Sequence, residues 1–418
     1  MMRRGLTLHP VEEAITLALR RGPKPRVEEV GIDEAHGRLA AEEVRAPSDV
    51  PPRDRSVLDG YAARWVDISG ATPESPAILR LAGHVPVDAG DPGGIGPREA
   101  ARVDTGSPLP RGADVVVPQE YVDVRGDRIA VLKAFPAGYG VAARGEDLRE
   151  GEKIVGVGDV INEARLGLLA SIGASRVKVY KPFRAVVHPV GDEIIEPWEE
   201  MAAGRVYDST SRLAVFWLRS RGVDARRGGR LGDSEEAVAR ALEEAVESGL
   251  ELAVFTGGTS VGGRDVTARV IRREADDYVH GLALTPGRPG LVAVVGGTLV
   301  LGLSGMPVAA WSQLVAVFDE YLRRILGRAR PWEPVLEARL ARRYASTPGM
   351  VNVVRARLHS KGGVASVEPL RVTGSGILST LVRANSYFVV PEDISGYDEG
   401  DIVETRLLPE CGGIARAW

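Results

Sequence analysis

The sequence predicts a multi-domain protein that combines α/β and β-rich domains. The chain has 418 residues, which is more than a single domain usually contains. Between residues 181 and 330, strand and helix patterns alternate, which is typical of a mostly parallel sheet covered by helices. Residues 51–140 and 331–418 instead carry short apolar runs broken by Gly and Pro, and such runs indicate β-rich domains.

The first 180 residues contain two expected helices and one expected hairpin. Residues 10–22 place apolar side chains at helical spacing, and residues 162–172 form a second helical pattern that is followed by glycine. The apolar runs 115–117 and 129–132 flank a turn at 125–127, so we expect these two runs to pair.

The second half supplies the strand–helix alternation and then a β-rich tail. Strands are expected at 185–187, 252–255, 291–295 and 299–303, and helices at 209–221, 234–248, 264–274 and 308–326. Short strands follow, expected at 351–357, 364–370, 387–390 and 402–407. This tail predicts a small C-terminal β-barrel or sandwich.

The charge balance argues against a nucleic-acid or membrane-surface protein. The chain carries 53 basic and 57 acidic residues, which gives a net charge of −4. Residues 289–318 lack charge, but Gly296-Gly297 and 304–307 interrupt them, so we expect no spanning helix. Since the first 22 residues are charged and helical in pattern, they do not resemble a secretory leader. We expect a cytoplasmic protein.

Lysine and the thermolabile residues Asn, Gln and Met are rare in this chain. Only six of the 53 basic residues are lysine, Gln occurs twice, Asn three times, and Met five times. This composition is typical of thermophile proteins, although a GC-rich genome would also favour Arg over Lys. The single Cys411 excludes internal disulfides and cysteine-rich metal sites.

Three glycine-containing loops follow expected strands, at 190–193, 256–265 and 303–307. Ligands of open parallel sheets bind outside the carboxyl ends of the strands. Glycine loops and helix N-termini present N–H groups to anions, and a helix also begins after Asp208. The carboxylates of Glu193, Asp233 and Asp265 belong to the same edge, so the pattern predicts a phosphate held with Mg²⁺.

Simpler interpretations of these residues stay open. Asp192, Asp208 and Asp233 are all placed to cap helices, and the glycine loops are equally compatible with plain turns. A serine hydrolase is a distant alternative, because the segment 258–262 matches a nucleophile elbow centred on Ser260. The chain contains no Gly-Lys pair, so a phosphate-binding P-loop is excluded.

Seven sequence blocks carry a family resemblance. They are Ser56–Ala62, Asp104–Val116, Arg144–Asp147, Gly191–Glu193, Tyr207–Ser209, Thr256–Asp265 and Pro286–Pro289. In this order and spacing they resemble the molybdopterin molybdotransferase family, which includes the MoeA proteins and the E domain of gephyrin. The resemblance extends over nearly the whole chain.

The resemblance implies a four-part architecture and a homodimer with the active site at its interface. Residues 1–50 and 141–180 would form a linker domain, and residues 51–140 a β-rich lid domain. Residues 181–330 would form an α/β molybdopterin-binding domain with a mostly parallel sheet, and residues 331–418 a C-terminal β-barrel domain.

The resemblance also implies an activity in molybdenum cofactor biosynthesis. Family members insert molybdate into the dithiolene of adenylylated molybdopterin in a Mg²⁺-dependent step that releases AMP. Tungstate is a second candidate oxyanion, given the heat-adapted composition. The alternative is a divergent, non-catalytic paralogue that binds the pterin or acts as a scaffold.

The family's site positions carry over to named residues. The functional acids would be Asp59, Glu193, Asp233 and Asp265, with Glu193 and Asp265 nearest Mg²⁺ and Asp59 supplied from the lid of the partner subunit. The substrate-binding positions would be Thr105, Arg144, Gly191, Asp208, Ser209, Gly257, Gly258, Ser260, Pro286, Arg288, Gly305, Pro307, Arg355 and Ser375.

This chain departs from the family where the site should be polar. Pro189 and Val190 replace two hydroxyl residues, Gly281 and Thr285 replace two lysines, and Ser304 and Met306 alter a Leu-Pro-Gly-Asn-Pro turn. We therefore expect altered oxyanion affinity or selectivity, with Arg288 supplying part of the missing charge.

Overall fold

The computed structural model describes residues 6–259, 265–329, 331–361, 363–370 and 374–408. The chain folds into two compact units. One comprises residues 29–156 and 160–177, and the other comprises residues 1–28, 157–159 and 178–418. The finer division into four domains remains a prediction.

The smaller unit is built around a six-stranded sheet of order β7-β4-β6-β5-β9-β8. Its strands are β4 (Gly60–Ala63), β5 (Ala77–Val85), β6 (Glu99–Val103), β7 (Val115–Pro118), β8 (Val122–Arg125) and β9 (Arg128–Val131). The expected hairpin turn is present, but β9 pairs with β8, whereas β7 pairs with β4. A 3₁₀ turn at Gln119–Tyr121 separates β7 from β8, so the run 115–117 belongs to another pair.

The rest of this unit contains short strand pairs and two helices, of which α2 spans Trp65–Ile68. The pairs are β1 (Val27–Gly31) with β12 (Arg176–Tyr180), β2 (Val44–Arg45) with β11 (Lys153–Val155), and β3 (Arg55–Ser56) with β10 (Val141–Ala142). Helix α3 (Glu163–Ser171) confirms the expected helix. Asn162 caps it by accepting the N–H of Arg165 at 3.0 Å.

The larger unit contains a six-stranded sheet of order β16-β13-β17-β21-β20-β18. These strands are β13 (Arg184–Pro189), β16 (Asp224–Arg227), β17 (Leu252–Thr256), β18 (Asp277–His280), β20 (Leu291–Val295) and β21 (Thr298–Leu303). The first four in the order are parallel, and β20 and β18 add an antiparallel edge. The mostly parallel sheet is therefore confirmed, although β16 and β18 were not expected.

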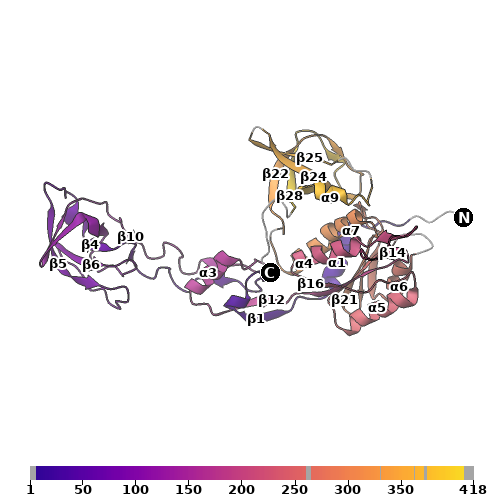
Figure 1. The fold of residues 1–418 in the computed structure, drawn as a ribbon, viewed down its shortest axis with the longest axis horizontal. Coiled ribbons are helices and arrows are strands. Elements are labelled where there is room, and N and C mark those ends of the chain that lie inside the picture. Colours follow the sequence, from indigo (N-terminus) through magenta and orange to yellow (C-terminus); the bar gives the residue numbers. More distant parts are fainter. Residues whose placement is uncertain (1–5, 260–264, 330, 362, 371–373, 409–418) are drawn as a thin grey trace. The chain divides into compact units, whose positions relative to one another are not determined.

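Helices cover both faces of this sheet (Figure 1). Helices α5 (Glu235–Glu247) and α6 (Val266–Glu274) pack on one face, and α1 (Val11–Arg21), α4 (Thr210–Ser220) and α7 (Pro307–Gln313) pack on the other. The Ser234 hydroxyl caps α5 by accepting the N–H of Ala237. The expected last helix is continuous through a π-helical segment, Leu314–Phe318, into α8 (Asp319–Ile325).

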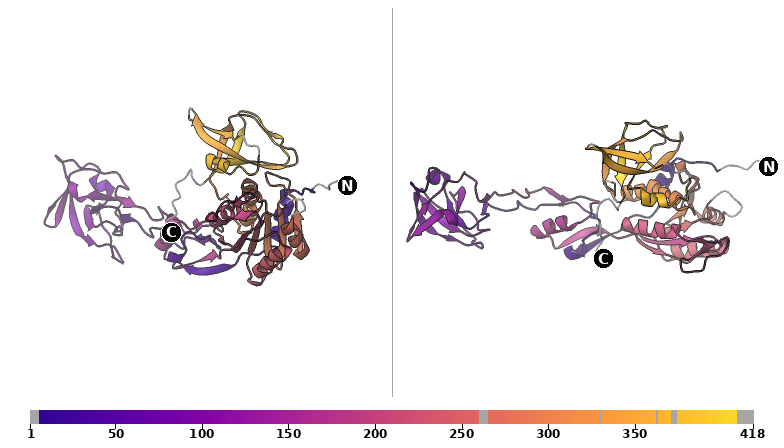
Figure 2. Two further views of the ribbon diagram at one scale, coloured as in Figure 1. Left: turned by 45° about the vertical axis from the view of Figure 1, so that its right-hand side comes forward. Right: turned by 45° about the horizontal axis from the view of Figure 1, so that its top comes forward.

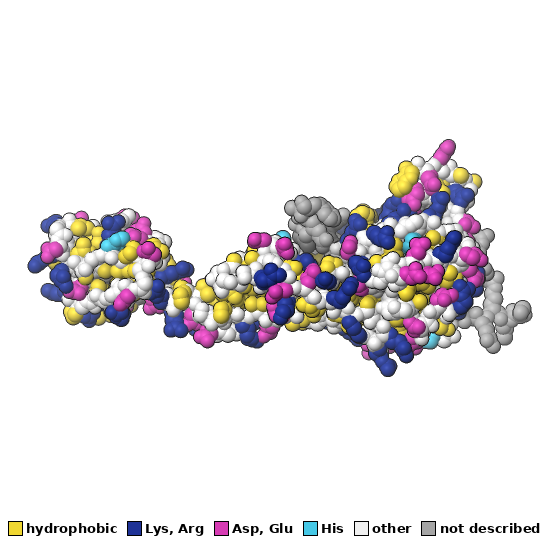
Figure 3. Space-filling model, turned by 90° about the horizontal axis from the view of Figure 1, so that it is seen from below, with side chains coloured by type: hydrophobic (Ala, Val, Ile, Leu, Met, Phe, Trp, Pro, Cys, Tyr) yellow, Lys and Arg dark blue, Asp and Glu magenta, His cyan; other side chains and the backbone are white. Residues whose placement is uncertain are grey.

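The uncharged run 289–318 forms the buried β20–β21 hairpin, the buried α7 helix and the π-helical segment that follows it. Across the described residues, none of the helices has the length and apolar character needed to cross a bilayer. On the face drawn in Figure 3, basic and acidic side chains are interspersed.

The C-terminal part closes into a five-stranded β-barrel, which confirms the barrel alternative (Figure 2). Its strands are β22 (Val335–Leu340), β24 (Val351–Lys361), β25 (Val364–Pro369), β26 (Ser386–Val390) and β28 (Ile402–Leu407). The pairing of β24 with β26 closes the ring. Val354, Val367 and Phe388 fill its core, and the short strand β19 (Leu284–Thr285) pairs with β24.

Candidate functional site

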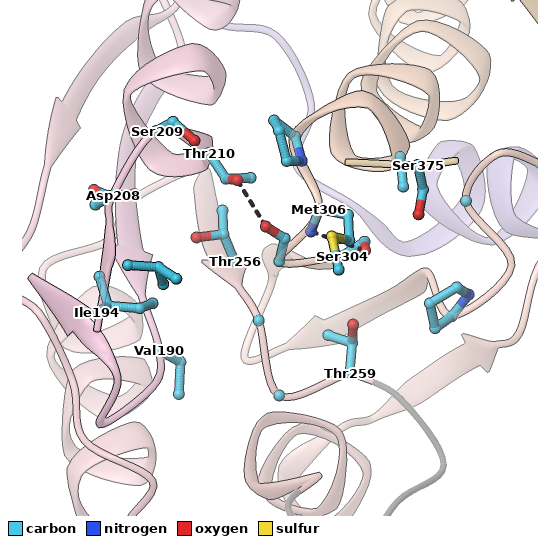
Figure 4. A pocket seen from close by; sticks show the side chains of 18 of the residues that line it. Val190, Ile194, Asp208, Ser209, Thr210, Thr256, Thr259, Ser304, Met306 and Ser375 are labelled. Atoms are coloured by element: carbon cyan, nitrogen blue, oxygen red, sulfur yellow. Dashed lines mark hydrogen bonds between the residues drawn. The ribbon is translucent and has the colours of Figure 1, made fainter. Parts of the chain in front are cut away.

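A pocket of about 870 Å³ lies at the carboxyl ends of β13, β17 and β21 (Figure 4). This is the sheet edge at which the sequence predicts ligand binding. The predicted site residues that line it are Glu193, Asp208, Ser209, Asp233, Gly257, Gly258, Asp265, Pro286, Arg288, Gly305, Pro307 and Ser375.

Other predicted residues lie elsewhere. Among the described lining residues of the pocket, Gly191 and Arg355 do not occur. Arg355 is buried in β24, where its Nε and Nη1 atoms have no hydrogen-bond partner. Ser260 lies outside the described residues, and Asp59 and Thr105 belong to the smaller unit, as does Arg144.

Close packing explains why the loops have glycine at positions 191 and 257. The N–H of Gly191 donates to the Leu231 carbonyl at 3.0 Å, and that of Gly257 donates to the Leu303 carbonyl at 2.9 Å. A Cβ at position 191 would lie 2.6 Å from a carboxylate oxygen of Glu193. At position 257 it would lie 2.5 Å from the Val190 carbonyl. These two N–H groups therefore already have partners within the protein, and the expected anion cradle does not form there.

Two of the helix N-termini at this edge also have acceptors already. The Ser375 carbonyl accepts the N–H groups of Val308 and Ala309, in the first turn of α7, at 3.0 and 3.3 Å. At α4, the Asp208 carboxylate accepts the N–H of Ser211 at 3.1 Å. The sequence led us to expect helix termini open to a ligand anion, but the α7 terminus already has the Ser375 carbonyl as its acceptor and the α4 terminus already has a carboxylate beside it.

Asp208 is a structural anchor of the pocket wall. Its side chain is buried and accepts the Ser211 hydroxyl. It also pairs with Arg212 at 3.1 Å and with Arg227 at 2.7 Å. The carboxylate is therefore committed to protein partners, which supports the capping interpretation over direct substrate binding.

Three other acids line the pocket and are better placed to meet a ligand. Asp265 precedes α6 without capping it through its side chain. Burial raises the pKa of Asp265 to about 6, against the opposing fields of Arg269 and Arg272. Asp233 is not a helix cap either, because Ser234 takes that role. Glu193 completes the set.

These acids do not form a complete metal site by themselves. The described residues contain no group of three or more His, Cys, Asp or Glu side chains that could hold a metal ion. Any cation here would need oxygen atoms from a bound ligand. Mg²⁺ is commonly held in this way, by one or two carboxylates together with phosphate oxygens.

Hydroxyl groups dominate the remaining polar surface of the pocket. They belong to Tyr207, Ser209, Thr210, Thr256, Thr259, Thr285, Ser304 and Ser375. Thr210 donates to the Gly305 carbonyl at 2.8 Å (Figure 4). Among the described lining residues, Arg288 is the only Arg or Lys. An anionic ligand would thus meet one cation and several neutral donors.

Comparison with known proteins identifies the relationship. Family models match residues 9–173 as the MoeA N-terminal region, 187–324 as a probable molybdopterin binding domain, and 337–408 as the MoeA C-terminal region. A putative molybdopterin biosynthesis protein of Methanocaldococcus jannaschii is 32% identical over 392 residues, covering 92% of both chains. The chain belongs to the MoeA family.

Further relatives agree with this assignment. Molybdopterin molybdenumtransferase 2 of Mycobacterium tuberculosis is 31% identical, covering 87% of this chain and 91% of its own length. The crystal structure of a molybdopterin biosynthesis MoeA protein from Pyrococcus horikoshii superposes with a TM-score of 0.77 at 31% identity. It covers 96% of this chain and 99% of its own.

The structure explains why position 281, where the family resemblance implied a lysine, carries glycine. Gly281 has a φ of +92°, and a Cβ there would lie 2.2 Å from the Thr7 carbonyl. The N-terminal segment therefore leaves no room for a side chain at this position. Thr285 differs, because it lines the pocket and its buried hydroxyl has no partner.

In the smaller unit of this MoeA-family chain, Thr105 donates to one carboxylate oxygen of Asp59 through its N–H at 2.6 Å and its hydroxyl at 2.8 Å. These bonds lower the pKa of Asp59. The exposed Arg144 pairs with Asp49 at 2.5 Å.

Several pocket residues were not predicted from the sequence. They are Ile194, Val206, Tyr207, Thr210, Thr256, Thr259, Gly287, Pro289 and Ala309, whereas Val190, Thr285, Ser304 and Met306 were expected only as departures from the family. Tyr207, Thr256, Thr259, Gly287 and Pro289 lie within the blocks that carry the family resemblance, which is the signal that could have identified them. Ile194, Val206 and Ala309 carry no such signal, because apolar side chains at these positions are equally typical of a core.

Proposed function

We propose that this protein is a molybdopterin molybdenumtransferase, which inserts molybdate into the dithiolene of adenylylated molybdopterin and releases AMP. The observation that carries the proposal is the pocket at the sheet edge, which Glu193, Asp233 and Asp265 line together with one cation, Arg288. A phosphoanhydride bound with a divalent cation suits this charge distribution. A molybdopterin molybdenumtransferase of Bacillus subtilis is 26% identical over 98% of this chain, which supports the assignment.

Within this proposal, the residues divide the work by their chemistry. Arg288 attracts the negatively charged phosphate or oxyanion, and the neighbouring hydroxyls orient it. Glu193 and Asp265 are the carboxylates that would hold Mg²⁺ together with ligand oxygens. When bound, Mg²⁺ would supply positive charge that offsets charge developing on the phosphoanhydride as it is cleaved. Asp208 keeps the wall in place through Arg212 and Arg227.

The observation that favours a cation here is that the Asp265 carboxylate does not cap helix α6. Burial disfavours its ionised form, and a bound cation would reverse that effect.

We also propose a homodimer, in keeping with the family resemblance. Sedimentation of the purified chain at several concentrations tests it, and a monomer throughout would contradict it.

The activity is tested with purified protein, adenylylated molybdopterin, Mg²⁺ and either molybdate or tungstate. We expect AMP release and a metallated pterin with at least one oxyanion, and the ratio of the two rates gives the metal preference. Tight pterin binding without oxyanion-dependent AMP release would instead support the non-catalytic alternative. Failure to bind the pterin at all would overturn both.

The serine-hydrolase alternative has no support in the described residues. Its base would be His280 or His359. His280 is buried and bonds through Nε2 to the Thr259 carbonyl, and His359 lies exposed on β24. A fluorophosphonate probe that labelled Ser260 would revive it.

A further inference from the structure

A buried histidine contacts the pocket wall from behind. His280 is the last residue of β18 and is only 9% exposed. Its Nε2 lies 3.1 Å from the carbonyl oxygen of Thr259, a residue that lines the pocket. Because a carbonyl oxygen can only accept, Nε2 carries the proton and donates it.

Thr259 is held from a second direction as well. It is 3% exposed, and its hydroxyl lies 3.4 Å from the Leu303 carbonyl at the end of β21. A Cβ at Gly302 would lie 3.1 Å from the Thr259 methyl group, so the fit against β21 is close. In the sheet order, β18 is the edge strand and β20 separates it from β21. Two strands therefore fix one pocket residue, and His280 supplies the contact from the edge.

We propose that His280 is a positioning residue of this site, whose hydrogen bond to Thr259 fixes the pocket wall after β17 and so sets the affinity for the phosphorylated ligand. The identity of that ligand rests on the proposed function. The position of Thr259 itself does not.

The surroundings of His280 keep it neutral at neutral pH. Burial lowers its pKa, and the hydrogen bond to the Thr259 carbonyl opposes this effect. The fields of Arg272 on α6 and of His9 in the N-terminal segment act in the same direction as burial. His9 in turn lies 3.1 Å from Glu13. A neutral imidazole can hold the Thr259 carbonyl without placing another charge beside an anionic ligand. Losing the donor would leave that buried carbonyl without its hydrogen bond, which is costly.

Two substitutions separate the hydrogen bond from the bulk of the ring. The His280→Gln variant keeps an N–H donor near the position of Nε2, whereas His280→Phe keeps a ring without a donor. The matched control is His188→Asn in β13, a partly buried histidine that belongs to a different cavity. All variants are made in the full chain.

The first measurement is the Kd of adenylylated molybdopterin with Mg²⁺, together with KM and kcat. We expect His280→Phe to raise Kd and KM about tenfold, the loss of one hydrogen bond of roughly 1.4 kcal/mol, with kcat changed less than threefold. His280→Gln and His188→Asn should stay within threefold of the parent Kd. Equal weakening by both His280 variants, or none by His280→Phe, would overturn the proposal.

The second measurement needs no ligand. Amide hydrogen exchange in residues 256–259 should accelerate in His280→Phe and not in His280→Gln. Unchanged exchange in His280→Phe would overturn the positioning role even if the enzyme is active. If the parent protein fails to bind the pterin, the proposed function fails with the affinity claim, and hydrogen exchange alone decides whether His280 positions Thr259.

Discussion

The Asp208 carboxylate lies 2.7 Å from the Arg227 guanidinium at the wall of the pocket. Arg212 contacts the same carboxylate, and the Asp208 side chain is only 2% exposed. Replacing Asp208 with Asn would remove the more deeply buried of the two carboxylates that both guanidinium groups share, leaving Glu196 as the other. We predict that Asp208→Asn lowers the free energy of unfolding by about 2–4 kcal/mol, as measured by urea denaturation. The control is Glu199→Gln, which breaks the more exposed pair with Arg230 and should cost less than about 1 kcal/mol. Similar losses in the two variants would contradict a structural role for Asp208.

A second buried ion cluster joins the α/β part of the larger unit to its barrel. Arg221 donates to Asp319 at 2.8 Å and also bonds to Glu333, and all three residues are buried. We predict that Arg221→Met costs about 3–5 kcal/mol in urea unfolding, because it strands two buried carboxylates. Adding Asp319→Asn and Glu333→Gln should recover most of that loss. A triple variant no more stable than Arg221→Met would contradict this explanation.

Gly281 occupies a position that leaves little space for a side chain. Its positive φ and the nearby Thr7 carbonyl both oppose a side chain. We predict that Gly281→Ala destabilises the protein by about 2 kcal/mol or more in thermal or urea unfolding. Gly297→Ala is the control, because Gly297 has a φ of +86° with nothing within 4 Å of its Cβ position. Equal costs at the two positions would show that the contact with Thr7 is unimportant.

His188 gives the fold a predictable response to acid. Burial lowers its pKa, opposed by its hydrogen bond to the Gly229 carbonyl at 2.8 Å and by Glu244 on α5. Arg226 and Arg227 on β16 act with burial. Because the folded pKa lies below the unfolded value near 6.5, the unfolded chain binds a proton that the folded chain resists. Stability that is present above pH 6.5 is therefore lost as the pH falls.

We predict that His188→Asn, which removes the titrating ring, shows a smaller fall in unfolding free energy between pH 7 and pH 5 than the parent protein. Urea titrations at both pH values measure it. His36→Asn, at an exposed position, serves as the control. Its unfolding free energy should fall between pH 7 and pH 5 as much as that of the parent protein. If the unfolding free energy of His188→Asn fell as much as that of the parent protein, the acid response could not be assigned to His188.

The sequence predicted the elements whose signals are local. The helix α5 has its Ser234 cap, and β17 and β21 are fully buried apolar runs. Strand β16, Asp224–Arg227, was missed because three of its four residues are charged and only its position at the sheet edge makes it a strand. The partner of β9 was misassigned because the sequence does not show which of two neighbouring apolar runs faces it.

The sequence predicted where the candidate site lies, but not the hydrogen-bond partners of its N–H groups. Three strand ends do meet at one pocket, as their positions before glycine loops indicated. Whether the N–H of Gly191 points to a ligand or to the Leu231 carbonyl depends on tertiary packing, which no local pattern encodes. The same holds for the Ser375 carbonyl, which reaches α7 from a segment more than sixty residues further along the chain.

The central claim is that the acids of this pocket perform the transfer chemistry. The most direct test is single-turnover AMP release with molybdate and Mg²⁺, measured for the parent protein, Asp265→Asn and Glu193→Gln, with the Kd of adenylylated molybdopterin measured in parallel. We predict a rate loss of about 100-fold or more in each variant, while Kd changes less than tenfold. Parental rates of AMP release in both variants would contradict the claim.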